Sequence, residues 1–202
     1  MRKAILFIAM SLDGYIADRE GKVDWLNSFD EVKEAEIRKE AGGAGETTLS
    51  EEGEDTYTEF IKGIDTIVMG WKTYYQIVTE LSPLEWPYKG LASYVITHRK
   101  EAWGRCKMEV ALEKISFVDK PPGELVRRLK KEPGKDIWIC GGANIIRQLM
   151  QEELIDRFHL SIIPIVLGSG IGLFAPMDRE LRLRLVDSRN HNGITEVVYE
   201  KE

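Results

Sequence analysis

Two adjacent glycines that follow an apolar run are the residues best suited to binding chemistry in this sequence. Residues 137–139 have strand character, Gly141 and Gly142 follow closely, and a helical pattern begins at once. Glycine lets the backbone turn tightly and lets a ligand reach the peptide groups. The first turn of a helix adds unpaired N–H groups and a positive dipole end. The pattern predicts a phosphate or pyrophosphate site, although the same residues also suit an ordinary turn.

A second strand end carries groups of the same kind. The β-rich run 65–69 breaks at Gly70 and leads into a helical stretch that we place at 73–81. Gly70 permits a ligand to approach closely, and Lys72 brings a positive charge. Thr73 offers a hydroxyl at an N-cap-like position. This strand end is therefore a second candidate for binding an anion.

A third strand pattern, 93–96, runs into a basic cluster that contains Thr97, His98 and Arg99. Such a cluster is commonly a solvated loop. Three strand ends that each offer anion-binding groups nevertheless suit one extended ligand with several phosphates. Neither Gly-x-Gly-x-x-Gly nor Gly-x-x-x-x-Gly-Lys-Ser/Thr occurs, so the sequence argues against a standard Rossmann or Walker site.

Alternating strand and helix patterns predict how these ends are held together. Strand patterns cover residues 4–9, 66–69, 93–97, 115–117, 137–139, 157–164, 181–188 and 194–200. Helix patterns cover residues 31–40, 54–63, 73–81, 123–132 and 143–152. Their alternation predicts an α/β fold with parallel pairing. Asn192-Gly193 between the last two strands is a hairpin signal, so the sheet should end in an antiparallel pair.

Length and composition are those of one globular domain spanning residues 1–202. Hydrophobic residues make up 43% and charged residues 31% of the chain, and a formal charge of −6 favours neither nucleic acid nor an anionic membrane as partner. Cys106 and Cys140 are too few for a disulfide framework, and Cys140 reads as a packing residue. The histidines lack metal-ligand spacing, so no metal is expected. With no signal-peptide layout and no apolar run long enough to span a bilayer, we expect a cytoplasmic protein.

Five segments, in order along the chain, resemble one enzyme superfamily. Residues 4–17 resemble the opening strand and loop of the reductase domain of riboflavin biosynthesis, a relative of dihydrofolate reductase. Residues 69–74 resemble the superfamily's Met-Gly-Arg-x-Thr signature, and 95–99 its strand end for the 2′-phosphate of NADPH. Residues 139–143 resemble its pyrophosphate turn, and 156–170, with Phe174, its next strand and substrate-side loop. Together the matches span nearly the whole chain.

The resemblance implies a three-layer α/β fold like that of dihydrofolate reductase, with a mixed, mostly parallel sheet and a C-terminal antiparallel hairpin. It implies NADPH as cofactor and a homodimer. The cofactor residues it implies are Ala9 and Ile16 beside the nicotinamide, then Gly70, Trp71, Lys72, Thr73, Thr97, His98, Arg99, Gly141, Gly142, Ala143, Asn144 and Ile145. On the substrate side it places Trp25, Phe60, Leu167, Gly168 and Gly170. Trp71 stands where the signature has arginine, so Lys72, His98 and Arg99 would supply the positive charge for the phosphates. Plain core packing also explains Ala9 and Ile16.

A carboxylate could accept the neighbouring N–H groups of an amino-pyrimidine or pterin and relay a proton. Asp13 ranks first because it follows the first strand directly, and Asp30 ranks second because it follows Trp25 at an interval similar to that in dihydrofolate reductases. Glu54 or Asp55 ranks third. Turn formation or helix capping also explains each of these residues. The glycine-rich stretch 42–53 reads as a surface loop or as a flap over the substrate.

These residues predict an NADPH-dependent reductase of a pyrimidine- or pteridine-like compound, nearest the ribosylamino-pyrimidine reductase of riboflavin biosynthesis. The deaminase signature of His-x-Glu with Pro-Cys-x-x-Cys, which often accompanies that reductase, does not occur. Two alternatives remain at this point. One is dihydrofolate reductase proper, and the other is a sensor module that binds NADPH without catalysis, because a fold alone does not establish chemistry.

Overall fold

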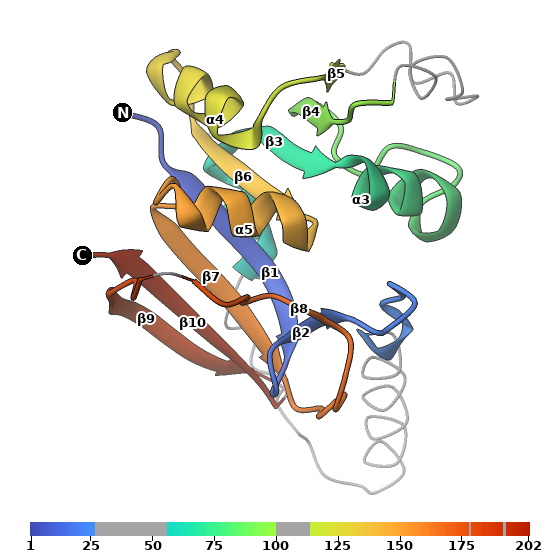
Figure 1. The fold of residues 1–202 in the computed structure, drawn as a ribbon, viewed down its shortest axis with the longest axis vertical. Helices are drawn as coiled ribbons and strands as arrows, with labels where there is room; N and C mark the ends of the chain where they lie inside the picture. Colours follow the sequence, from blue (N-terminus) through green and yellow to red (C-terminus); the bar gives the residue numbers. More distant parts are fainter. Residues whose placement is uncertain (27–55, 100–113, 178, 192) are drawn as a thin grey trace, which may run out of the picture.

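The computed structural model describes residues 1–26, 56–99, 114–177, 179–191 and 193–202 (Figure 1). Several predicted features lie outside the described residues: the helix 31–40, the stretch 42–53, Asp30, Glu54, Asp55 and Cys106.

An eight-stranded sheet forms the centre of the molecule, in the order β5-β4-β3-β6-β1-β7-β10-β9. Its strands are β1 (Ala4–Ser11), β3 (Ile64–Gly70), β4 (Ala92–Ile96), β5 (Ile115–Val118), β6 (Asp136–Gly141), β7 (Arg157–Ile163), β9 (Leu183–His191) and β10 (Ile194–Lys201). The first six strands in that order run parallel. β10 is antiparallel to both β7 and β9. The predicted mixed sheet with a C-terminal hairpin is thus confirmed.

Helices cover both faces of this sheet and make three layers (Figure 1). They are α2 (Thr56–Lys62), α3 (Trp71–Gln76), α4 (Pro122–Lys131) and α5 (Ala143–Gln151), and α3 continues into a π-helical turn, η1 (Ile77–Leu81). On one face, α4 and α5 bury Leu129 and Leu149 against Leu6 of β1. On the other face, α2 and α3 pack Phe60 and Tyr74 in a cluster with Trp138 of β6. Successive residues of a strand point to opposite faces, so β1 serves both clusters.

The start of α3 corrects one expectation. The helix begins at Trp71, and its N-cap is Gly70, which has no side chain to cap it. Thr73 is therefore the third helical residue and not an N-cap. Trp71 and Tyr74 are one turn apart with ring centroids 5.6 Å apart, so aromatic packing explains why the helix begins before the threonine.

A second, two-stranded sheet was not predicted. It pairs β2 (Tyr15–Ala17) with β8 (Ile171–Gly172) in antiparallel fashion. Strands of three and two residues are too short to show an alternating pattern, and they meet only because the chain brings distant segments together. This pairing sets the loop before β8 against the loop that follows β1.

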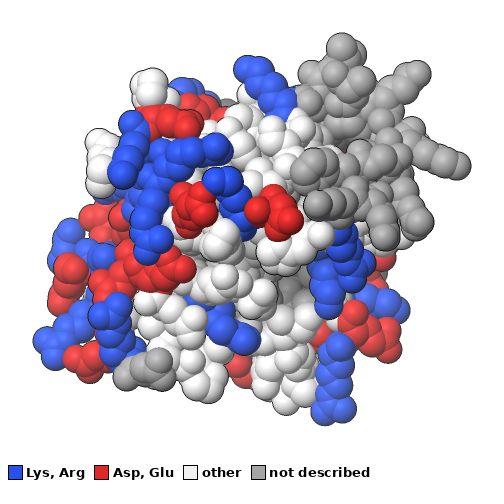
Figure 2. Space-filling view, turned by 45° about the horizontal axis from the view of Figure 1, so that its top comes forward, with Lys and Arg blue, Asp and Glu red and all other residues white. Residues whose placement is uncertain are grey.

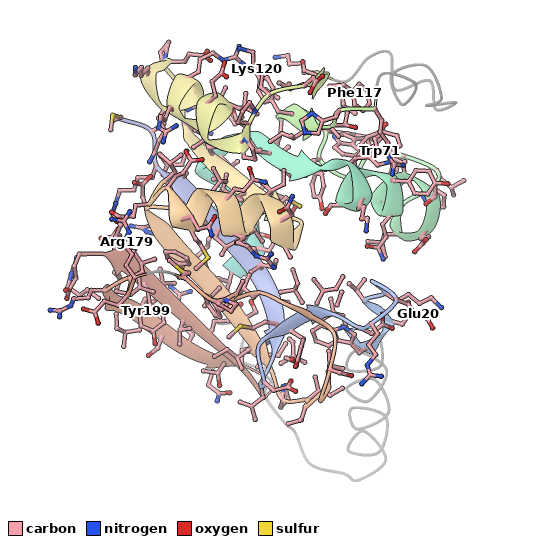
Figure 3. The ribbon with its side chains drawn as sticks, viewed as in Figure 1. Glu20, Trp71, Phe117, Lys120, Arg179 and Tyr199 are labelled. Atoms are coloured by element: carbon pink, nitrogen blue, oxygen red, sulfur yellow. The ribbon has the colours of Figure 1, made fainter. Side chains whose placement is uncertain are left out.

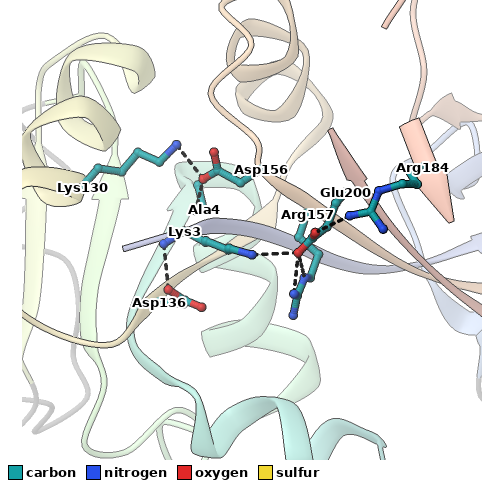
Figure 4. A network of polar contacts seen from close by, with 8 residues as sticks. All are labelled: Lys3, Ala4, Lys130, Asp136, Asp156, Arg157, Arg184 and Glu200. Carbon is teal, nitrogen blue, oxygen red and sulfur yellow. Dashed lines mark hydrogen bonds and ion pairs between the residues drawn. The ribbon is translucent and has the colours of Figure 1, made fainter. Parts of the chain in front are cut away.

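Charged side chains hold the start of β1 to its neighbours (Figure 4). Glu200 of β10 accepts hydrogen bonds from Lys3 (2.7 Å) and Arg157 (2.6 Å). These two bonds lower the pKa of Glu200 to about 2. Asp156 likewise accepts from the Ala4 amide at 2.7 Å. Elsewhere on the surface, basic and acidic side chains are interspersed on the face shown in Figure 2.

Candidate functional site

The carboxyl ends of β3, β4 and β6 meet at one edge of the sheet, as their parallel pairing requires. Met69 pairs with Gly141, and Gly70 pairs with Ile96. The three predicted anion-binding strand ends are therefore neighbours in space. Ligands of open parallel sheets bind outside the carboxyl ends of the strands, so this edge is the expected place for one.

Backbone, with hardly any side chain, lines the centre of this edge. A Cβ on Gly142 would lie 3.2 Å from Thr73 Oγ1, and one on Gly70 would lie 3.4 Å from Ile145 Cγ1. Gly141 has a φ of +140°, which side chains rarely adopt. We call Gly70, Gly141, Gly142 and the first turn of α5 the glycine cradle. The crowding at Gly142 and the positive φ of Gly141 favour glycine at these two positions, whereas a Cβ on Gly70 would make an ordinary contact.

The first turn of α5, which forms part of this cradle, has no side-chain cap. Its N-cap is Gly142, and no side chain bonds to the first N–H groups. The Ile145 amide donates to the Gly142 carbonyl at 2.9 Å, so Ile145 contributes packing and not a free donor. The amides of Ala143 and Asn144 remain suited to an anion, because a helix N-terminus presents unpaired N–H groups and a positive dipole end. This arrangement fits the pyrophosphate of a dinucleotide.

The basic residues of the site differ in how free they are. Lys72 and Arg99 are exposed, and neither forms an ion pair with a carboxylate among the described residues. His98 contacts Asp119 through Nδ1, so one of its two ring nitrogens is engaged. Thr97 is buried and accepts a hydrogen bond from the Arg99 amide at 3.1 Å, so it shapes the turn that carries Arg99. Lys72 and Arg99 are thus the cations of this edge without a carboxylate partner among the described residues, and a phosphate contact from His98 stays a prediction.

Trp71 packs in an aromatic cluster beside α3. Its ring lies 6.3 Å from the ring of Phe117 and 5.8 Å from that of Tyr75, centroid to centroid, and Figure 3 shows it with Phe117 beside α3. The aromatic cluster fills the place where the family signature has arginine. A role for Trp71 beside the cofactor stays a prediction.

Asp13, the first-ranked carboxylate, holds the substrate-side loop. It accepts hydrogen bonds from Ser11 Oγ (2.6 Å) and from the amides of Leu167 (3.1 Å) and Gly168 (2.7 Å). The bonds from Ser11, Gly168 and Leu167 keep the pKa of Asp13 below its ordinary value. Gly170 completes the contact, since a Cβ there would lie 2.2 Å from the Ala17 carbonyl oxygen. The structure therefore brings the predicted loop residues to Asp13, and a direct role for Asp13 on substrate stays a prediction.

The remaining predicted residues lie on different faces of the sheet. Phe60 stacks on Phe7 at 4.4 Å, on the face covered by α2, and Ala9 projects from that same face by strand alternation. Ile16 packs against the cluster beneath α4 and α5 instead. Trp25 is half-buried just before the undescribed segment. Burial raises the pKa of the Cys140 thiol to about 12, which agrees with a packing residue and not a nucleophile.

Sequence reasoning missed a polar group of residues under α2. His159 of β7 and Glu196 of β10 line a pocket of about 330 Å³ beside Phe60. A glutamate in an alternating strand normally indicates the solvent face, so no sequence signal marked it. His159 was equally unmarked, because its neighbours in sequence carry no metal or catalytic pattern.

Residues 2–194 of the chain match the RibD C-terminal domain family. The chain belongs to that family. YwjB of Bacillus subtilis strain 168, described as uncharacterised, is 33% identical over 198 residues, which cover 98% of this chain and 97% of YwjB.

Solved structures show the same fold. A candidate riboflavin biosynthesis protein from Shewanella sp. PV-4 superposes with a TM-score of 0.75 at 23% identity, with 99% of both chains covered. Dihydrofolate reductase from Enterococcus faecalis, complexed with NADP(H), gives a TM-score of 0.53 at 16% identity, covering 98% of this chain and 96% of that one. The predicted three-layer fold of a RibD C-terminal domain is confirmed. Among the described residues of this domain, no helix is long and apolar enough to cross a membrane.

Proposed function

We propose that this RibD C-terminal domain is an NADPH-dependent reductase that acts on an amino-pyrimidine or pteridine-like ring. The observation that carries the proposal is the glycine cradle at the carboxyl edge of β3 and β6. A Cβ on Gly142 would crowd Thr73 Oγ1, Gly141 has a positive φ, and the first turn of α5 has no side-chain cap. The E. faecalis dihydrofolate reductase, which shares the fold, is complexed with NADP(H). These features support a dinucleotide as the ligand.

Each part of the site has a task in this proposal. Bound NADPH supplies the hydride. Gly141, Gly142 and the first amides of α5 bind the pyrophosphate, because backbone N–H groups there can reach it. Lys72 and Arg99 add positive charge, and Arg99 follows the strand end that suits a 2′-phosphate. Charge-assisted hydrogen bonds of this kind are the strong ones in proteins.

A second candidate is an NADPH-binding sensor without catalysis. One observation favours it: the carboxylate of Asp13 already accepts hydrogen bonds from Ser11 and two loop amides. A carboxylate engaged in this way has less capacity for a substrate. The reductase proposal therefore needs either Asp13 to share its bonds or another carboxylate to take the task.

We also propose a homodimer. Edge strand β9 exposes 52% of Leu185 and 44% of Val186, and exposed apolar side chains on an edge strand favour association. Light scattering after size exclusion would give the mass in solution and test this part alone.

A kinetic assay that measures NADPH oxidation as the decrease in its absorbance tests the function. The full chain would be incubated with NADPH and, in turn, a ribosylamino-pyrimidine, dihydrofolate and a small imine. We expect turnover with the amino-pyrimidine. Tight NADPH binding with no oxidation by any compound would favour the sensor, and faster turnover of dihydrofolate would favour dihydrofolate reductase proper.

A further inference from the structure

The pocket under α2 is separate from the glycine cradle. Phe60 and Thr56 of α2 line one side, and His159, Asp187, Arg189 and Glu196 of the three last strands line the other. Its volume is about 330 Å³, large enough for a ring compound of modest size. None of the cradle glycines lines it.

Ion pairing leaves one charge of this pocket without a counterion. Arg157 pairs with Glu200 at 2.6 Å, and Arg189 pairs with Glu59 at 3.2 Å and Asp187 at 3.0 Å. The arginines at the pocket are thus committed to other carboxylates. Glu196 has no cation partner among the described residues.

Among the described residues, the hydrogen bonds to the Glu196 carboxylate come from hydroxyl groups. Thr56 Oγ1 donates to Oε2 at 2.6 Å, and Ser161 Oγ lies 3.4 Å from Oε1, which is long for a hydrogen bond. An ionised carboxylate has about four acceptor positions. Glu196 therefore keeps capacity for further N–H or O–H donors, and its side chain is only half-buried.

His159 adds a second polar group, one whose hydrogen-bonding capacity the described residues leave partly unused. The residue is buried, and its Nε2 has no hydrogen-bond partner among the described residues. Burial lowers the pKa of His159, so the ring is neutral at neutral pH. Its ring stands edge-on to Phe7 at 4.5 Å between centroids. Buried polar groups in proteins are nearly always hydrogen-bonded, so this nitrogen at the pocket wall offers a hydrogen-bonding position to a bound ring.

Strand register relates this pocket to the cradle. Ala9 of β1 pairs with Ser161 of β7, and Ser161 pairs with Glu196 of β10. Leu6 of β1 lies opposite Ile139 of β6, so Ala9 is about level with Gly142. Ala9, Ser161 and Glu196 thus form one row across three strands, and Gly142, just past the end of β6, lies at about the same level. At the usual strand spacing, about 15 Å separates the cradle from Glu196.

We infer that this pocket binds the ring of a flat nitrogen heterocycle with neighbouring N–H donors, and that Glu196 is the carboxylate that accepts them. The inference rests on the proposed function, because it assigns to Glu196 the recognition of the substrate ring. Aromatic Phe60 provides an apolar wall for the ring. The Glu196 carboxylate, which has no cation partner among the described residues, favours ligand groups that donate hydrogen bonds over groups that accept them. An amino-pyrimidine has this combination of a flat ring and adjacent N–H groups.

Calorimetric titration of the full chain with a diaminopyrimidine tests the inference without relying on NADPH. Glu196→Gln removes the charge and keeps the shape. We expect it to weaken binding by about ten- to a hundredfold, the effect of losing a charged hydrogen bond. The matched control is Glu180→Gln, an exposed glutamate that pairs with Arg182 and does not line the pocket, and the diaminopyrimidine affinity of that variant should stay within about twofold of wild type. Unsubstituted pyrimidine, which lacks the donors, should bind wild type and Glu196→Gln equally weakly.

Nuclear magnetic resonance of the His159 ring provides a second measurement, on wild type alone. Added diaminopyrimidine should shift its signals and leave those of His191 unchanged. No binding by wild type, or equal binding by wild type and Glu196→Gln, would overturn the inference. NADPH titration separates it from the proposed function. If diaminopyrimidine binding depends on Glu196 but NADPH does not bind, the pocket is supported and the reductase proposal is refuted. If NADPH-dependent turnover is unaffected by Glu196→Gln, the role of the pocket is refuted and the reductase proposal is supported.

Discussion

Thr73 Oγ1 lies so close to Gly142 that a Cβ on the glycine would stand 3.2 Å from it. The contact joins the first turn of α3 to the N-cap of α5, and hence the ends of β3 and β6. The Thr73 side chain thus occupies the space that a side chain at position 142 would need.

Gly142→Ala should weaken NADPH binding while the protein stays folded. The φ of Gly142 is −84°, which alanine adopts freely, so the added methyl group acts by occupying space and not by backbone strain. We expect affinity to fall by about tenfold or more, with an unchanged circular dichroism spectrum. Gly90→Ala is the control, because Gly90 has a φ of +83° and open space around its Cβ position. That variant should lose some stability and keep its affinity; normal NADPH binding by Gly142→Ala would show that the turn is only structural.

Asp13→Asn should lower thermal stability and leave NADPH affinity unchanged. The negative charge accepts two loop amides, and an amide side chain has only one oxygen to offer them. Because the folded pKa of Asp13 is depressed, its stabilising effect is present above the unfolded pKa and is lost as pH falls through the folded value. Melting curves of both proteins should therefore converge in acid. A large loss of turnover with unchanged melting would instead place Asp13 on the substrate.

Glu200→Gln should make the protein less stable than wild type at neutral pH, and this difference in stability should disappear in acid. Lys3 and Arg157 lower the pKa of Glu200 from 4.5 to about 2, so the carboxylate stabilises the fold above pH 4.5 and ceases to do so as pH falls toward 2. Urea midpoints of wild type and variant should differ at neutral pH and meet near pH 2. Glu180→Gln, which removes an exposed pair with Arg182, should change the midpoint little at any pH. A constant difference across the range would mean that the charge of Glu200 is not responsible.

Much of the fold was predictable because local patterns and packing agree. Apolar runs followed by glycine located β3 and β6, and the Asn-Gly turn before β10 indicated the antiparallel end of the sheet. The pairing of β2 with β8 was not predictable, since two short segments acquire strand geometry only from each other. The start of α3 was misplaced because a threonine looks like a cap, whereas the packing of Trp71 on Tyr74 extends the helix.

The site was predictable in part for the same reason. Gly70 and Gly142 each follow an apolar strand pattern, so the sequence itself marks where the backbone is left without a side chain. The pocket around Glu196 has no such mark, because a glutamate in an alternating strand becomes half-buried only when α2 packs above it. Whether Asp13 points to substrate or to a loop likewise depends on where residues 167 and 168 return, which no local pattern specifies.

We predict that the choice between the two nicotinamide cofactors depends on Arg99. Its side chain is exposed beyond β4 and pairs with no carboxylate among the described residues. Arg99→Ala should therefore remove most of the preference for NADPH over NADH, and raised salt should narrow that preference in wild type. Lys120→Ala is a suitable control, because Lys120 is a nearby cation that pairs with Glu124. Equal loss of NADPH preference in both variants would mean that general charge, and not Arg99, makes the selection.

Titration of wild-type protein with NADPH and with NADH, measured by calorimetry at moderate salt, tests the central claim most directly. We predict that NADPH binds with one site per chain and about ten- to a hundredfold more tightly than NADH, the effect of a charged contact to the 2′-phosphate. The absence of NADPH binding, or equal affinity for the two cofactors, would contradict the assignment of this edge of the sheet as an NADPH site.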